Sequence, residues 1–379
     1  MLKYCVGIDV SKNDLHCCIA VIDQLQKVTI KASKHFINSK TGFTGLSDWI
    51  NKQHKDRSVP LVMVMEATGV YYEQLALYLF KHQYAISVVL PNKAKRYLQS
   101  TGLKSKNDKI DAQGLARMGS EQSLSLWHPL DTFFYELREL TRQHQSLQEL
   151  KTSVGNQLHA SELGMYQIKL VIKQQKNLIA SIEKQITVLE DAIEQHLQRD
   201  TTVKEKVAGI CKIKGLGLMT VAVILAETNG FVLFENSRQL VSYAGYDVEE
   251  NESGTHKGRT RITKKGNSRI RRILHMPAFN MIRYEQTPFF NLFNRTFQKH
   301  GQKMKSYVAI QKKLLTIIFA LWKNNSVYQR NYGVEFTGEM ELVPSSLHTL
   351  KESSAYQKAA LPQGRPTVEN SQFASSLQE

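Results

Sequence analysis

The sequence predicts a chain of mixed fold class, with an α/β amino-terminal region, a long helical connector and a basic, mainly α carboxy-terminal region. Three patterns lead to this prediction. Apolar runs of strand length fill the first hundred residues, a heptad-like apolar spacing follows, and a cation-rich segment with helical periodicity comes after it. At 379 residues the chain is long enough for two or more domains, because domains usually contain ~100–200 residues.

The amino-terminal region has the pattern of a mixed sheet. Three short apolar runs joined by turn-forming residues open the chain and favour an antiparallel meander: residues 3–10, 14–23 and 26–33. A helix is expected near 42–55. A continuous apolar strand then runs from Pro60 to Glu66, followed by helical spacing over 70–83 and a second buried strand, "YAISVVLP". The alternation of strand, helix and strand indicates a mostly parallel extension of the sheet.

The connector and the region beyond it are predicted to be helical. Isoleucine and leucine recur in steps of seven, three and four, as in a coiled-coil seam, at Ile172, Ile179, Ile182, Ile186, Leu189 and Ile193. This spacing leaves open whether the seam pairs within the chain or between chains. Residues 207 to about 333 are compact and basic, with helical patterning at 219–227 and 266–284. Beyond residue 336 the chain is polar and aperiodic, which predicts a disordered tail.

Charge and cysteine content narrow the class of partner and the compartment. Lysine and arginine number 50 against 34 acids, for a formal charge of +16, which favours nucleic acid over a membrane surface as partner. The cysteines have no paired CxxC spacing and three of the four lie in apolar runs, which predicts core thiols in a reducing cytosol: Cys5, Cys17, Cys18 and Cys211. We find no signal peptide and no apolar run near ~18 residues, so a cytoplasmic protein with no membrane span is expected.

Four carboxylates are candidates for a metal site. Asp9 closes the first strand and Glu66 the fourth, where an uncompensated charge after an apolar run is expensive. Asp108 and Asp111 are three residues apart and share one face of a helix. Each acid alone could be a cap or a surface charge. Together they could hold two Mg²⁺ ions, which take oxygen ligands and, about 3.5–4 Å apart, assist phosphodiester chemistry.

Basic residues are candidates for nucleic-acid contacts in two stretches. Cations flank the second pair of acids, although a solvated helix face would look similar: Lys93, Lys95, Arg96, Lys104 and Lys106. The stretch 251–275 has eight cations and no acid after residue 253, with glycines that allow close backbone approach to nucleic acid. The residues predicted to bind there are Lys257, Arg259, Arg261, Lys264, Lys265, Asn267, Arg269, Arg271 and Arg272.

Two further features are weaker signals. Gly215 and Gly217 bracket a tight hairpin before a predicted amphipathic helix, as in a helix-hairpin-helix element whose backbone amides hold a phosphate, although a packing turn is equally compatible. Ser253 lies in a predicted loop and could attack phosphorus if cations or metals lower the barrier to its ionisation. The residues alone make three others equally eligible as nucleophile: Ser242, Tyr243 and Tyr246.

Taken in order, the motifs resemble the insertion-sequence one-ten family of DEDD transposases. They are "GIDVSK", "EATGVY" and "KNDKIDAQGLAR", followed by "GLGLMTVAVILAE", "QLVSYAG", "ESG" and "KKGNSRIRRIL", from about residue 3 to 284. The resemblance implies an α/β domain of RNase H/RuvC-like fold at 1–125, a coiled-coil connector at 126–203 and a transposase domain at 204–333. Residues 334–379 would form the tail.

The resemblance also implies a chemistry. Asp9, Glu66, Asp108 and Asp111 would hold Mg²⁺, and Ser253 would attach covalently to DNA. Members of the family excise and insert their element through such serine–DNA linkages, guided by a bridge RNA that pairs with donor and target DNA. The implied partners are therefore double-stranded DNA, a bridge RNA and further copies of the chain, from dimer to tetramer, with a composite active site. The implied location is the bacterial cytoplasm, at the nucleoid during reaction.

This chain departs from the family pattern in two ways, and other functions stay open. The stretch "DVEENES" at 247–253 is acidic, which raises the cost of an alkoxide at Ser253 unless cations offset it. The tail has no counterpart in the motifs. The alternatives are a site-specific DNA invertase of the same family, a RuvC-like junction resolvase or nuclease with no covalent step, and a nucleic-acid-binding protein whose acids are structural.

Overall fold

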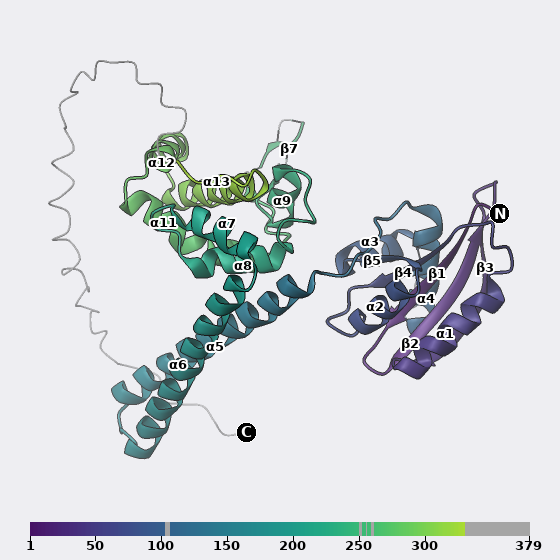
Figure 1. Ribbon diagram of the computed structural model, residues 1–379, viewed down its shortest axis with the longest axis horizontal. Coiled ribbons are helices and arrows are strands. Elements are labelled where there is room, and N and C mark those ends of the chain that lie inside the picture. The colour runs from purple at the N-terminus through teal and green to yellow at the C-terminus, as the bar shows by residue number, and fades with distance from the viewer. Residues whose placement is uncertain (103–106, 250–251, 255, 259–260, 330–379) are drawn as a thin grey trace, which may run out of the picture. The chain divides into compact units, whose positions relative to one another are not determined.

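The computed structural model describes most of the chain, and Figure 1 labels its helices and strands. The described residues are 1–102, 107–249, 252–254, 256–258 and 261–329. The predicted tail and three predicted nucleic-acid contacts lie outside them, namely Lys104, Lys106 and Arg259. None of the described helices is long and apolar enough to cross a membrane.

A five-stranded mixed sheet forms the amino-terminal part. Its strands are β1 (Lys3–Val10), β2 (Asp14–Ile22), β3 (Val28–Ile37), β4 (Leu61–Glu66) and β5 (Ala85–Val89), in the order β3-β2-β1-β4-β5. The first three pair antiparallel, whereas β4 pairs parallel with β1 and β5 parallel with β4. The predicted meander and parallel extension are therefore confirmed. The third strand is longer than predicted, because at the sheet edge its alternating exposed residues break the apolar run.

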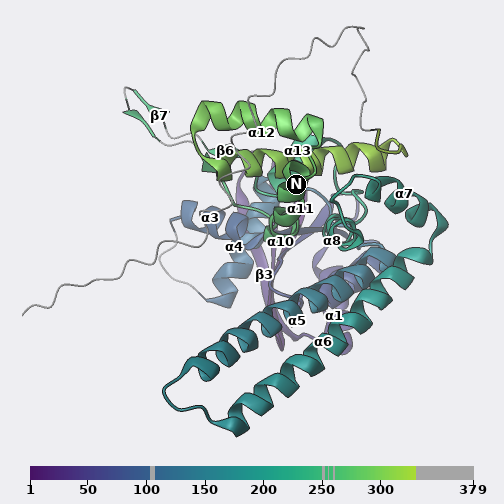
Figure 2. The same ribbon diagram turned by 90° about the vertical axis from the view of Figure 1, so that its left-hand side faces the viewer.

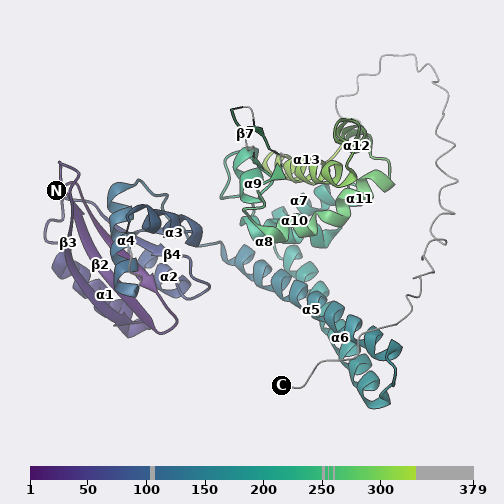
Figure 3. The same ribbon diagram turned by 180° about the vertical axis from the view of Figure 1, so that it is seen from behind.

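Helices cover both faces of this sheet (Figures 1 and 3). On one face, α1 (Lys40–Gln53) and α2 (Glu73–Lys81) pack over a core that includes Ile8, Leu15 and Met63. On the other face lie α3 (Pro91–Ser100) and α4 (Asp108–Glu121). Because side chains alternate along a strand, β1 turns its even-numbered residues to α1 and α2 and its odd-numbered residues to α4.

Gly7 sets the position of α4 on the sheet. A Cβ atom at Gly7 would lie 2.1 Å from the carbonyl oxygen of Ala112 and 2.2 Å from the amide nitrogen of Ala116. Both atoms belong to the α4 backbone and cannot rotate away, so only glycine lets the helix lie this close to β1. The first turn of α4 is thereby held near the end of β1, where Asp9 lies.

Two long helices make up the connector, α5 (Thr132–Leu163) and α6 (Lys169–Gln198), and they pack along one another as an antiparallel hairpin (Figure 2). The core between them contains Leu147 and Val154 from α5 with Ile182 and Ile186 from α6. The isoleucine seam therefore pairs within the chain, a point that the spacing left open.

Seven shorter helices form most of the carboxy-terminal part within the described residues. They are α7 (Thr201–Cys211), α8 (Leu218–Thr228), α9 (Ser237–Tyr243), α10 (Ser268–Ile273), α11 (His275–Arg283), α12 (Thr287–His300) and α13 (Lys303–Lys323). The amphipathic helix predicted at 219–227 is wrong in one respect: every residue of α8 from Thr220 to Thr228 is buried, because α5, α7 and α10 all pack against it. The helical stretch at 266–284 divides at Leu274, since Pro277 clashes with a helix continuing from the preceding turn.

The segment between α9 and α10 is a β-ribbon where the sequence predicted a loop. Strand β6 (Val248–Glu249) pairs antiparallel with β9 (Arg261–Ile262). Further out, β7 (Glu252–Ser253) pairs antiparallel with β8 (His256–Lys257). The two pairings are nested along the chain, so Ser253 lies near the outer end of this ribbon.

Candidate active site

The strand register brings two of the four predicted acids to one edge of the sheet. Ile8 of β1 pairs with Met65 of β4, and Asp9 and Glu66 are the next residue of each strand. Both follow the alternation onto the face that α4 covers, where Val64 and Gly7 contact that helix. Asp9 and Glu66 are thus neighbours at the carboxyl ends of parallel strands.

The start of α4 carries the other two acids. The side chain of Asn107 caps the helix, accepting a hydrogen bond from the amide of Ile110 at 2.9 Å. Asp108 and Asp111 therefore lie in the first turn, where negative charge is favoured by the helix dipole. The Asp108 side chain is 64% exposed, so the site opens to solvent on this side.

A histidine that the sequence did not single out joins these acids. His16 pairs directly with Asp9 across β1 and β2, and its Nδ1 lies 3.6 Å from a carboxylate oxygen of Asp108. Among the described residues, Asp9, His16 and Asp108 form a group whose ligand atoms all lie within 4.8 Å of one another. The sequence contained a signal for this pairing. A tight turn at Ser11–Asp14 closes the hairpin of β1 and β2, and in such a hairpin residue 9 faces residue 16.

This donor set fits a divalent cation. Carboxylate oxygens and an imidazole nitrogen are the usual protein ligands of such ions, and here they converge from β1, β2 and α4. Glu66 and Asp111 do not belong to this group of three residues. Their backbone positions nevertheless place them on the same side of the sheet, in β4 and α4. The structure thus brings two of the four predicted acids, Asp9 and Asp108, together with His16.

The cysteines take no part in this site. Cys5, Cys17 and Cys18 are buried, and burial raises the pKa of the Cys5 thiol to about 12. Burial also raises the pKa of Cys17, with Cys18 and Asp9 adding to the effect. These neutral thiols pack in the core, as the sequence predicted.

Cations lie on the helix before α4. Lys93, Lys95 and Arg96 are exposed on α3, on either side of the buried Ala94. This arrangement suits contacts to a phosphate backbone and equally suits a solvated helix face.

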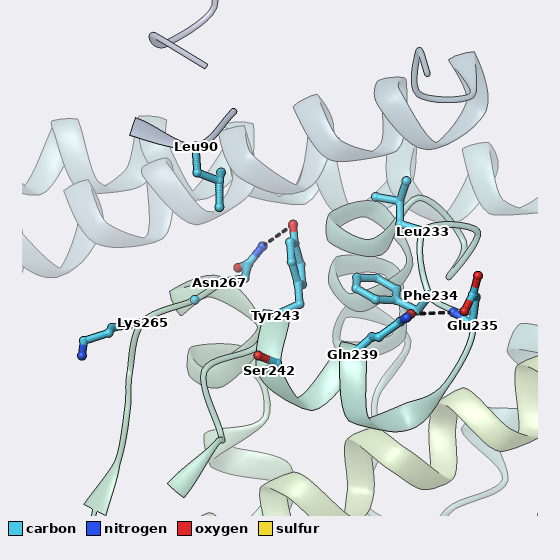
Figure 4. A pocket seen from close by; sticks show the side chains of 10 residues that line it. Leu90, Leu233, Phe234, Glu235, Gln239, Ser242, Tyr243, Lys265 and Asn267 are labelled. Carbon is cyan, nitrogen blue, oxygen red and sulfur yellow. Dashed lines mark hydrogen bonds between the residues drawn. The ribbon is translucent and has the colours of Figure 1, made fainter. Parts of the chain in front are cut away.

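The four candidate nucleophiles differ in exposure and in hydrogen bonding. Ser253 is exposed and is followed by Gly254, whose φ of +57° is a left-handed conformation that favours glycine at this turn. Tyr246 is buried and donates a hydrogen bond to Gln311 at 2.9 Å, and burial raises its pKa strongly. Tyr243 donates to the carbonyl of Glu227 at 3.0 Å. Ser242 is exposed on the wall of a shallow pocket (Figure 4). Both tyrosine hydroxyls therefore donate hydrogen bonds within the fold, although the Tyr243 side chain is exposed, whereas the two serines are exposed on the surface.

Part of the negative charge before Ser253 is compensated across the ribbon. A carboxylate oxygen of Glu249 accepts a hydrogen bond from Lys265 Nζ at 2.8 Å, and Arg261 Nε lies 3.9 Å from its second oxygen. Lys265 holds the pKa of Glu249 below its usual value. Two cations thus offset the negative charge of Glu249, one of the acids in "DVEENES".

The buried carboxylate of Glu227 links α5 to the start of α10, in the basic segment 251–275. Arg142 of α5 binds it through Nε at 2.8 Å and a second nitrogen at 3.1 Å, and Asn267 donates to it at 2.7 Å. Burial acts to raise the pKa of Glu227, but Arg142 and Asn267 outweigh it and the pKa is lowered. Asn267 also contacts Tyr243 (Figure 4) and caps α10. Glu227 was not among the predicted site residues, although it ends the apolar run "VAVILAE" as Asp9 and Glu66 end theirs.

Most of the predicted nucleic-acid residues of this segment make contacts within the fold. Arg269 lies 3.9 Å from Glu227, Arg271 donates to the carbonyl of Ala244 at 2.8 Å, and Arg272 pairs with Glu149 of α5. Four of these cations are nevertheless exposed, namely Arg261, Lys264, Lys265 and Arg272. Lys257 lies in β8 beside the serine strand.

The glycine hairpin before α8 packs tightly at one end only. Gly215 has a φ of +97°, and a Cβ there would lie 2.9 Å from Asn280 Cβ. Asn280 also donates to the Gly215 carbonyl at 3.2 Å. Gly217 caps α8 and has open space within 4 Å of its Cβ position. The first glycine is therefore required by packing, whereas the second leaves room for a ligand.

A second basic surface was missed. From residue 286 to 329 the sequence contains no Asp or Glu. The cations of this stretch are all exposed on α12 and α13, namely Arg295, Lys299, Lys303, Lys305, Lys312, Lys313 and Lys323. The signal was the absence of acids over this stretch, a pattern that the shorter segment at 254–275 shares.

Carboxylates at the end of a mixed sheet, together with cation-rich helical surfaces in the same chain, define an enzyme that acts on nucleic-acid phosphates. Family comparisons give its particular class. A DEDD transposase model of the IS110 family matches residues 6–163, and the model described as "Transposase IS116/IS110/IS902 family" matches residues 208–292. The chain belongs to this family and is a DNA transposase or recombinase.

Named relatives include enzymes of two kinds. The chain is 29% identical to the pilin gene-inverting protein of Moraxella bovis, over 87% of this chain and 99% of the relative. It is 21% identical to the transposase for insertion sequence element IS1111A of Coxiella burnetii, over 64% of this chain and 72% of the relative. Among solved structures, Thermus thermophilus RuvC matches at 13% identity and a TM-score of 0.26, over 33% of this chain and 99% of RuvC.

Proposed function

We propose that this protein cuts and rejoins DNA through a Mg²⁺-dependent acid site and a covalent ester between Ser253 and DNA. One observation carries the proposal: Asp9 and Asp108, distant in sequence, meet with ligand atoms within 4.8 Å at the end of the sheet. Glu66 and Asp111 complete the ligand set. The ions would act as Lewis acids that stabilise negative charge on the phosphate. Substitution of the metal ligands tests this role.

In the proposed reaction, Ser253 Oγ attacks a DNA phosphorus and loses its proton to solvent or a nearby base. The bond from phosphorus to one deoxyribose oxygen breaks as the serine ester forms, and that oxygen takes a proton. A deoxyribose hydroxyl of a second DNA end then attacks the ester, which restores the serine and joins the new strands. The phosphoester bond is conserved in the serine ester, so rejoining needs no external source of energy.

The exposed position of Ser253 and the cations around it support this role. Ser253 lies at the outer end of a ribbon whose base carries Arg261 and Lys265, so DNA bound at the serine has positive charge further down the same ribbon to hold its backbone. The second basic surface on α12 and α13 offers a further site for DNA or for a bridge RNA that pairs with donor and target. The open side of Gly217 would hold one phosphate in a helix-hairpin-helix manner.

The finer organisation is proposed on the same basis. The order of the sheet supports an RNase H/RuvC-like domain at 1–125, followed by a coiled-coil connector at 126–203 and the serine-bearing transposase domain at 204–333. We propose that the protein works as a dimer or tetramer in the cytoplasm, where the acids of one copy act with the serine of another.

An invertase is the second candidate, and the length of the match to the Moraxella protein favours it. That relative is named for inverting a pilin gene, and this chain aligns with 99% of it. Both reactions use the same cutting and joining steps. The DNA flanking the gene distinguishes them, because a transposase requires element ends and an invertase requires an invertible segment.

A denaturing gel tests the proposal. Purified protein is incubated with Mg²⁺, RNA transcribed from the flank of the gene and labelled donor and target DNA. We expect a protein–DNA adduct that survives boiling, vanishes in Ser253→Ala and persists in the matched control Ser242→Ala, the other exposed serine among the four candidate nucleophiles. Cleavage without an adduct, unchanged in Ser253→Ala, would replace the proposal with a resolvase or nuclease.

A further inference from the structure

Three polar residues form a row across the first three strands. Asp9 of β1 pairs with His16 of β2, and His16 pairs with His35 of β3. Directly paired residues of antiparallel strands point to the same face of the sheet. The row therefore lies on the α4 side, and the Asp108 carboxylate approaches it from the first turn of that helix.

The His16 ring is contacted by β3 on the side opposite to Asp9. The ring of His35 lies 4.9 Å from the ring of His16, at an angle of 52°. His35 is itself fixed by a contact of 2.9 Å between its Nε2 and a carboxylate oxygen of Asp14. His16 directs Nδ1 to Asp108, and only 32% of its side chain is exposed. Histidine ligands of metal sites are held in orientation by the groups around them, and the ring of His35 is such a neighbour of His16.

We propose that His16 supplies a nitrogen ligand to the cation held by Asp9 and Asp108, and that the site consequently binds a first-row transition cation such as Mn²⁺ more tightly than Mg²⁺. Mg²⁺ is a hard ion that selects oxygen, whereas transition cations accept imidazole nitrogen readily. The inference rests on the metal site of the proposed function and deepens it. His35 is a positioning residue that acts through His16.

Direct metal binding by the full-length protein tests this inference without any DNA reaction. Free Mn²⁺ is followed by electron paramagnetic resonance, and Mg²⁺ affinity is obtained by competition. His16→Ala should weaken Mn²⁺ binding about tenfold or more and change Mg²⁺ affinity much less. His159→Ala is the matched control, because His159 is exposed on α5, far along the chain from the site, and it should change neither.

Electron spin echo modulation gives a second readout. Mn²⁺ bound to the native protein should show coupling to an imidazole ¹⁴N nucleus, and His16→Asn should remove it while keeping an oxygen donor of similar size. His35→Ala should keep the coupling and weaken Mn²⁺ binding modestly. Native protein without ¹⁴N coupling, or His16→Ala with unchanged Mn²⁺ affinity, would overturn the inference. An equal loss of both metals in His16→Asn would also overturn it, since that points to a structural role.

Asp9→Asn separates this inference from the function beneath it. If Asp9→Asn loses Mn²⁺ and Mg²⁺ while His16→Ala loses neither, only the nitrogen ligand is wrong. If Asp9→Asn also binds both metals as the native protein does, the acid site itself is wrong, and the proposed metal-dependent reaction fails with it.

Discussion

The acid site and the serine ribbon are built in opposite ways. The acids are placed by two paired strands and by a capped helix that Gly7 holds against β1. Ser253 lies in a strand of two residues at the outer end of a ribbon, exposed, with a left-handed glycine next to it. Sites on packed strands and helices hold geometry more closely than sites on exposed segments. The comparison indicates that the ligands are preorganised, whereas the nucleophile is presented to its substrate.

The largest effect is expected from breaking the acid site. Asp9→Asn, Glu66→Gln or Asp111→Asn should lower the rate of strand cleavage by about a hundredfold or more, because each removes a ligand to the ion that stabilises charge at phosphorus. DNA binding should stay close to that of the native protein, since the basic surfaces are untouched. Cleavage and filter-binding assays in Mg²⁺ measure the two properties. Normal cleavage by these variants would refute the metal assignment.

The next largest effect is expected where α4 packs against β1, because this contact holds the acids in place. Gly7→Ala should lower the free energy of unfolding by about 2–3 kcal/mol, because its Cβ overlaps the backbone of α4. Gly155→Ala is the matched control: a Cβ at this helical position meets nothing within 4 Å, so alanine should stabilise by up to about 1 kcal/mol. Urea unfolding measures both. Equal stability of the two variants would contradict the close approach of α4.

A third prediction concerns Glu227, which organises the region below the ribbon. Its folded pKa is lowered, so the stability it contributes is present above its unfolded value of 4.5 and is lost as pH falls through the folded pKa. Glu227→Gln should cost about 2 kcal/mol at neutral pH, because Arg142 loses its charged partner, and much less in acid. Thermal unfolding across this range checks the sign. A difference between native and variant that does not shrink in acid would contradict it.

The smallest effect is expected at the second basic surface. If Lys305 and Lys312 each contact one phosphate, replacing both by glutamine should reduce the slope of log affinity against log salt by about 2. Lys184→Gln on α6 is a control that should leave the slope unchanged, since this lysine is exposed on the connector hairpin. Titrations of DNA binding at several salt concentrations measure the slope. An unchanged slope in the double variant would remove α13 from the interface.

The fold was predictable where the signal is local. Apolar runs marked β1, β2, β4 and β5, and the position of Asp9 and Glu66 at strand ends followed from them. Failures came where neighbours decide the outcome. The helix α8 seemed amphipathic by its spacing but is buried along nearly its whole length, and 266–284 divides into α10 and α11. Both errors arise because burial depends on the elements packed around a helix as well as on its own period.

What the sequence by itself determined is the strands of the main sheet, the family and four candidate acids, because apolar period, turn residues and ordered motifs are properties of the chain alone. The tertiary structure decided which groups meet. Only strand register brings His16 to Asp9, and only the contact at Gly7 sets Asp108 beside them. Glu227 likewise gains its role from Arg142, 85 residues away. Such contacts join distant segments, so their geometry arises from packing and register that local patterns do not contain.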